Sequence, residues 1–71
     1  MQAPPSAPPL VPLTPAERRV LSVLCQGRSN RAIALELVVS HRTVEDHVSH
    51  LLAKTGCHNR SELMLWALGE R

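Results

Sequence analysis

Aromatic residues are almost missing from this chain of 71 residues, which has one tryptophan and no tyrosine or phenylalanine. Its core must therefore be built from leucine, valine, isoleucine and alanine, a composition typical of a helical bundle. Cysteine is also scarce. Cys25 and Cys57 cannot form the disulfide framework of a small secreted domain, and we expect two reduced thiols in a cytoplasmic protein. There is no apolar run of roughly 18 residues and no secretory signal, so we expect no membrane partner.

The length allows one small domain with a modest core. Such a domain has little room for a substrate pocket, and no nucleophile, base and orienting residue stand out together. The sequence therefore predicts neither an enzyme nor a bound cofactor. The formal net charge of +2 and the pI of about 8.9 suit nucleic-acid binding without requiring it.

The first segment, residues 1–12, holds five of the six prolines and no charged side chain. This composition predicts an extended or disordered lead-in, with the folded domain at residues 13–71. A linker from another domain and a plain disordered tail fit the composition equally well.

The most informative segment runs from Ser40 to Gly56, where the pattern predicts one helix. Ser40 is a good N-cap, and Gly56 can adopt the left-handed conformation that closes a helix. Helical spacing places one apolar stripe on the packing side, formed by Val44, Val48, Leu51 and Thr55. The opposite side carries Arg42, Asp46, Ser49 and Ala53, with Glu45 and His50 at its edges. One side of this helix is therefore available to contact another molecule.

Three further helices are expected, which makes the fold all-α. The first follows a capping box, in which Thr14 is the N-cap and Glu17 the third helical residue, and it ends at Gly27. The second runs from the N-cap Ser29 to about Leu37. Because only Val38 and Val39 link it to Ser40, the second and third helices should form a helix-turn-helix.

The fourth helix is expected from about Asn59 to Leu68. Six consecutive apolar residues, 63–68, would make it apolar on all sides, and so small a domain should cover only one. We interpret it as a self-association helix. A frayed C-terminus and packing against a missing domain are the alternatives.

Several histidines and one cysteine invite a comparison with metal sites, namely His41, His47, His50, Cys57 and His58. Their spacing matches no common zinc motif, and a structural zinc site needs four converging ligands. The sequence therefore predicts no metal site, and His47 is better interpreted as a residue packed at the edge of the apolar stripe.

From Leu13 to Leu68 the chain resembles the LuxR-type (GerE-type) helix-turn-helix domain of bacterial transcription regulators. The resemblance is carried by Leu13–Glu17, Val20–Leu21, Gly27, Ser29–Asn30, Ile33–Ala34, Leu37, Ser40, Thr43–Val44, His47–Val48, Lys54, Gly56, Asn59–Arg60 and Glu62–Leu63. It implies a four-helix bundle that binds double-stranded DNA as a dimer, with RNA polymerase as a further candidate partner. Such domains usually follow a sensory or receiver domain, as in response regulators.

The resemblance also implies residue roles. The helix from Ser40 to Thr55 would enter the major groove, with Glu45, Asp46 and Ser49 at the base edges. Phosphate contacts would come from Asn30, Arg42, Thr43, His50 and Lys54. The dimer contact would use Met64, Leu65 and Leu68. Members of the family commonly carry a basic residue at the place of Glu45 and a neutral one at Asp46, so we expect weaker DNA binding here.

Two alternatives remain open from the sequence. A helix-turn-helix with an acidic outer face and an outward-facing Leu35 could be a protein-interaction module that docks on related regulators or titrates them. A fragment similar to the promoter-reading region of a sigma factor would share the same helix plan. The spacings Ser-Asn-x-x-Ile-Ala and Thr-Val-x-x-His-Val favour the LuxR-type family over the sigma factor.

Overall fold

The computed structural model describes residues 12–69, and over this range the chain forms four α-helices. They are α1 (Pro15–Leu24), α2 (Asn30–Leu37), α3 (His41–Thr55) and α4 (Arg60–Leu68). The predicted all-α fold with four helices is confirmed. The expectation for the proline-rich segment falls on residues 1–12, of which only Pro12 lies within the described residues.

Side-chain caps fix where each helix begins. Thr14 Oγ1 accepts from the backbone N–H of Glu17 at 3.1 Å, and Glu17 Oε1 accepts from the N–H of Thr14 at 3.0 Å. This is the predicted capping box, in which two backbone donors at the helix start are satisfied reciprocally. The N-cap position of the other three helices is occupied by Ser29, Ser40 and Asn59. α1 ends at Leu24, slightly earlier than predicted, and a turn then leads to Gly27.

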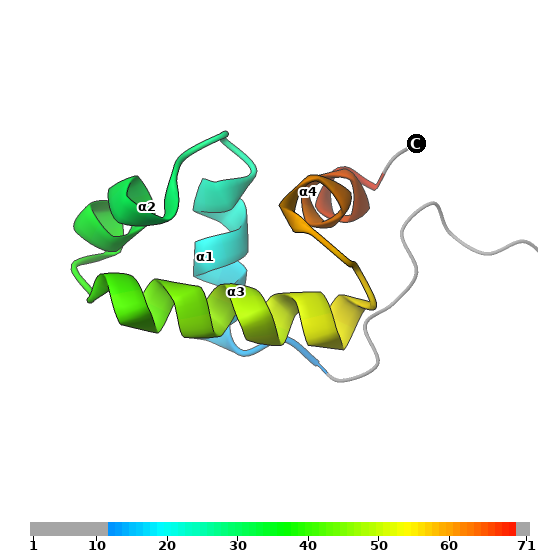
Figure 1. Cartoon of the computed structure of the whole chain (residues 1–71), viewed down its shortest axis with the longest axis horizontal. Helices are drawn as coiled ribbons and strands as arrows, with labels where there is room; N and C mark the ends of the chain where they lie inside the picture. Colours follow the sequence, from blue (N-terminus) through cyan, green and yellow to red (C-terminus); the bar gives the residue numbers. More distant parts are fainter. Residues whose placement is uncertain (1–11, 70–71) are drawn as a thin grey trace, which may run out of the picture.

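The longest helix, α3, lies across the other three, as Figure 1 shows. α2 packs near the N-terminal end of α3, α4 packs near its C-terminal end, and α1 lies between them. The core contains side chains from all four helices: Val20, Leu21, Val23, Leu24, Ile33, Ala34, Val44, Leu51 and Leu63. Burying aliphatic side chains is the main stabilising contribution in a domain of this size, and here it holds α3 by one side only.

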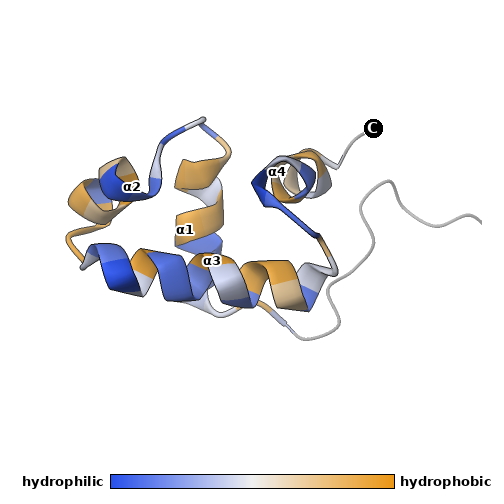
Figure 2. Cartoon of the chain, viewed as in Figure 1, coloured by the Kyte–Doolittle hydropathy of each residue, from blue (hydrophilic) through white to orange (hydrophobic). Residues whose placement is uncertain are grey.

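The turn between α2 and α3 has an unusual backbone. Val38 caps α2 with φ of +57°, in the left-handed region, and its side chain is exposed. A β-branched residue is strained in this conformation. The turn places two apolar residues at the surface, Val38 and Val39, and Figure 2 shows this link in orange. The tight link sets the angle at which α3 leaves α2.

Candidate nucleic-acid interface

The outer face of α3 is exposed along its length. Arg42, Glu45, Asp46, Ser49 and His50 are all exposed, and the Arg42 side chain is 82% accessible. On the opposite side, Val44 and Leu51 are fully buried, while Val48 and Thr55 are half-buried. The two-sided helix predicted from the sequence is confirmed. A rigid helix held by its apolar side can present its polar side to a partner.

Both acidic residues of this face are paired with a neighbour one turn earlier. Glu45 Oε2 lies 3.3 Å from His41 Nδ1, and Asp46 Oδ1 lies 3.7 Å from Arg42 Nε. Exposed pairs of this kind contribute about 0.3–0.5 kcal/mol to helix stability. The pairs are therefore weak enough to be replaced by contacts with a phosphate or a base. Without a bound partner molecule, Arg42 stays beside Asp46. The spacing of four residues within each pair can be seen in the sequence.

Lys54, expected at a phosphate, is directed instead to α1. Its Nζ donates to Glu17 Oε1 at 2.6 Å and to the Pro12 carbonyl oxygen at 3.2 Å. Burial raises the pKa of the Glu17 carboxyl. The hydrogen bonds from Lys54 and Thr14 and the charge of Lys54 outweigh burial, so the pKa lies below its ordinary value of 4.5. An ammonium group has three donors. Two are in use here, and one is left for a phosphate.

Asn30 is similarly engaged. Its Oδ1 accepts from Arg60 Nη1 at 2.7 Å, and Arg60 also donates to the backbone carbonyl of Arg28. The start of α4 is thereby joined to the start of α2. Within residues 12–69 the carboxamide nitrogen of Asn30 forms no hydrogen bond, so it is the group that remains for a phosphate. Thr43, the last predicted phosphate contact, is half-buried, with its hydroxyl 2.8 Å from Ser40 Oγ.

The apolar residues of α4 divide into two sets. Leu63 is fully buried, and Met64, Trp66 and Ala67 pack partly against the core. The two remaining leucines are exposed: Leu65 by 59% and Leu68 by 58%. The domain thus covers more of α4 than expected from its size. Of the three residues predicted for a dimer contact, two face outward and Met64 lies at the boundary with the core.

The structure brings two of the histidines together, but with a partner on another helix. Ligand atoms of Glu17, His47 and His50 lie within 4.8 Å of one another. Over the part of the chain that the structure describes, no other trio of potential metal ligands converges in this way, and His41, Cys57 and His58 do not join it. Glu17 lies 30 residues before His47 in the chain, so spacing alone could not reveal this cluster.

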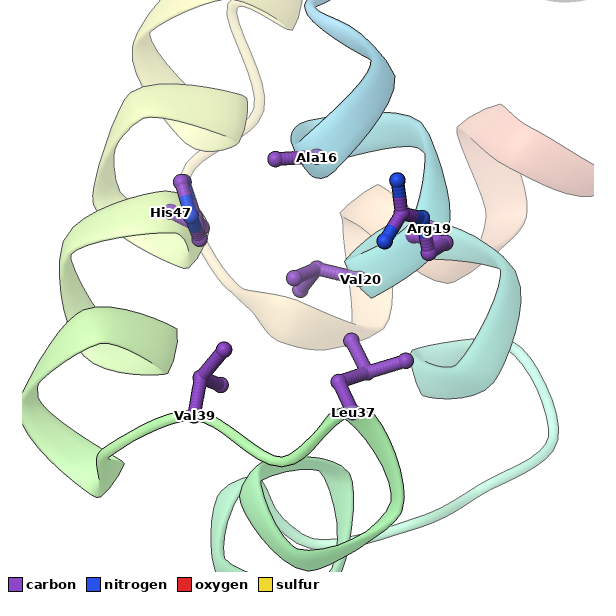
Figure 3. Close-up of a pocket in the computed structure, with 6 residues that line it drawn as sticks. All are labelled: Ala16, Arg19, Val20, Leu37, Val39 and His47. Carbon is purple, nitrogen blue, oxygen red and sulfur yellow. The ribbon is translucent and has the colours of Figure 1, made fainter.

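A small hollow lies between the first three helices. Its volume is about 40 Å³, and Figure 3 shows the six side chains that line it, with His47 on the α3 side and Ala16 and Arg19 on the α1 side. Pockets for small ligands are usually about 300–1,000 Å³, so this hollow cannot hold a substrate. Among the described residues, no helix is both long and apolar enough to cross a membrane.

A short turn between α2 and α3, with the polar side of α3 exposed, defines a helix-turn-helix DNA-binding domain. The family model for bacterial regulatory proteins of the luxR family matches residues 11–67. The chain therefore belongs to the LuxR-type helix-turn-helix family. Its members are DNA-binding transcription regulators and not enzymes.

Curated relatives show the same affiliation. The response regulator Rre1 of Synechocystis is 47% identical over 55 residues, covering 78% of this chain and 24% of that protein. The nitrate/nitrite response regulator NarL of Escherichia coli is 41% identical over 59 residues, covering 83% of this chain and 27% of NarL. A putative regulator of Mycobacterium tuberculosis, Rv0890c, is 46% identical over 52 residues, covering 73% of this chain and 6% of that protein. The chain thus spans about a quarter or less of these relatives.

Proposed function

We propose that this domain, in the cytoplasm of a bacterium, binds duplex DNA by placing the outer face of α3 in the major groove. The observation that supports this most is the exposed polar face of α3 opposite a fully buried apolar side. Glu45, Asp46 and Ser49 would face base edges, where a carboxylate accepts from the N4 amino group of cytosine. Arg42, near the start of this face, and His50, at its edge, would contact phosphates.

Salt dependence tests the phosphate contacts. Each phosphate that is neutralised contributes about 0.9 to the slope of log affinity against log salt. Arg42→Ala should weaken binding to every duplex and reduce the slope by about that amount. Arg18→Ala is the matched control, because Arg18 is exposed on α1, off its apolar stripe. If neither the parent nor the control forms a complex with duplex DNA at about 50 mM salt, the proposal is wrong.

We further propose that two copies associate through Leu65 and Leu68 of α4, with Met64 at the margin. Leu65 and Leu68 are three residues apart on α4 and both exposed, so they can form one apolar contact surface for a second copy. Leu65→Glu should give monomers in sedimentation at concentrations where the parent dimerises. Leu35→Glu is the control, because Leu35 is also an exposed leucine but lies on α2. A parent that stays monomeric both on and off DNA would contradict this contact.

A protein-interaction module remains the second candidate function. The observation that favours it is the pair of exposed apolar side chains on and after α2, Leu35 and Val38, together with an α3 face whose two carboxylates each lie beside a neighbouring side chain. A related regulator and RNA polymerase are the candidate partners. Failure to bind any duplex, together with specific binding to either protein that Leu35→Glu abolishes, would select this function over DNA binding.

A further inference from the structure

The trio Glu17, His47 and His50 lies between α1 and α3, and its exposed member is His50, at the edge of the outer face of α3. His47 and His50 are one turn apart on α3, and Glu17 is in the first turn of α1. One ligand atom from each lies within 4.8 Å of the other two. The cluster therefore combines residues of α1 and α3, and an ion bound by all three would join the two helices.

The environment of the carboxylate and imidazole atoms in this trio favours a bound ion. Glu17 is almost fully buried, and its Oε1 is held by Thr14 N–H and Lys54 Nζ, which fixes the carboxylate. Its Oε2 lies 3.7 Å from His50 Nδ1. His47 Nδ1 is buried, and within residues 12–69 it has no hydrogen-bond partner. Buried polar atoms are nearly always satisfied, so an exception in a native fold needs an explanation, and a bound ion is one.

We propose that Glu17, His47 and His50 form a binding site for a divalent transition-metal ion, with zinc the best fit. Two imidazoles and one carboxylate are a donor set that suits zinc, whereas magnesium and calcium prefer oxygen ligands alone. With bonds of about 2.0–2.1 Å, neighbouring ligand atoms of a tetrahedral zinc are about 3.3 Å apart. The observed separations require a closure of about 1.5 Å at most. His50 supplies it most easily, because its side chain is exposed.

Lys54 limits the strength of this site. Its ammonium stays on Glu17 Oε1, and its positive charge opposes a cation on the other oxygen. Three protein ligands also leave at least one coordination position open, unlike the closed four-ligand sites that structural zinc occupies. The ion should therefore bind reversibly and fasten α3 to α1.

Zinc titration of the purified chain, followed through the imidazole nitrogen signals in NMR spectra, tests the site. His47 and His50 should shift together and saturate at one zinc ion per chain, while magnesium has no effect. His50→Gln should weaken zinc binding by at least about tenfold, because losing a group that only orients a metal ligand already costs that much. His41→Gln and His58→Gln are the controls and should leave zinc binding unchanged.

Other outcomes would overturn the proposal. Equal shifts of all four histidines would indicate adventitious binding only, and so would a loss in His58→Gln, because His58 adjoins the Cys57 thiol. No shift of His47 and His50 at zinc concentrations that saturate an ordinary histidine pair would rule out the metal site and leave only the contact between His50 and Glu17. His50 is exposed, so its variant should fold; circular dichroism of His50→Gln checks that the helices are intact.

Discussion

Replacing Lys54 by methionine should lower the free energy of unfolding of the domain, independently of any contact with DNA. Methionine keeps the apolar part of the side chain and removes the ammonium that lies 2.6 Å from Glu17 Oε1. In the parent, the Glu17 side chain is 4% exposed and that of Lys54 19% exposed, so water cannot replace the lost partner fully. The variant therefore leaves a buried carboxylate whose remaining partners are Thr14 and, 3.7 Å from Oε2, His50 Nδ1.

The size of the effect follows from the burial of this pair. Removing one partner of a buried ion pair costs about 3–5 kcal/mol, and the partial exposure of Lys54 places this case at about 3 kcal/mol. A domain of this length has a free energy of unfolding of roughly 3–9 kcal/mol. Lys54→Met should therefore lower the melting temperature by about 12–24 °C.

The double variant Glu17→Gln/Lys54→Met gives the sharpest test. Glutamine can still accept the backbone hydrogen bond of the capping box at the third helical position. It carries no charge, so the loss of Lys54 leaves no buried charge without a partner. The double variant should thus be more stable than Lys54→Met alone, although it contains one more substitution. Urea unfolding followed by circular dichroism measures all four members of the cycle. Additive losses, or a loss below 1 kcal/mol for Lys54→Met, would refute the reasoning.

Three further predictions concern separate parts of the domain. Val38→Asn should raise the free energy of unfolding by about 1 kcal/mol, because asparagine tolerates the left-handed conformation better, while Val39→Asn, measured in the same urea series, should not. Glu45→Gln with Asp46→Asn should tighten binding to scrambled duplexes and narrow the gap to a selected sequence, and unchanged binding to both would place this pair outside the groove. The backbone N–H and ring of His58 hold the pKa of Glu62 below 4.5. Glu62 therefore contributes stability above that pH, and the difference between the parent and Glu62→Gln should shrink as pH falls below it, as acid titration of both proteins will show.

Features that depend on neighbours in sequence could be predicted well. Thr14 and Glu17 form the capping box that their spacing indicates, and Ser40 and Gly56 bound α3 as expected. Each of these depends on hydrogen bonds between residues three or four apart. The spacing of apolar residues likewise predicted which side of α3 is buried, because Leu51 and its stripe follow the helical period.

Contacts between distant residues could not be predicted in the same way. Glu17 has one recognisable role in its own helix, and nothing in the spacing indicates that the same oxygen also binds Lys54, 37 residues later. The bond from Arg60 to Asn30 spans 30 residues and depends on how α4 meets α2. On α4 the run of apolar residues left the division between core and surface open, since only packing decides that Met64 turns inward and Leu65 outward.

The charges of α3 bear on how this domain would bind DNA. Lys54 is bound to Glu17, so its charge is directed away from the outer face of α3. On that face Arg42 stands against the carboxylates of Glu45 and Asp46, and the face therefore attracts phosphates poorly. Part of the attraction must then come from outside α3. Arg31, beside Asn30 at the start of α2, is exposed and forms no ion pair within residues 12–69. The free N–H groups of a helix start also favour an anion. We therefore expect α2 to add to the salt-dependent affinity that Arg42 and His50 provide, while the acidic pair on α3 discriminates between bases by rejecting the wrong ones.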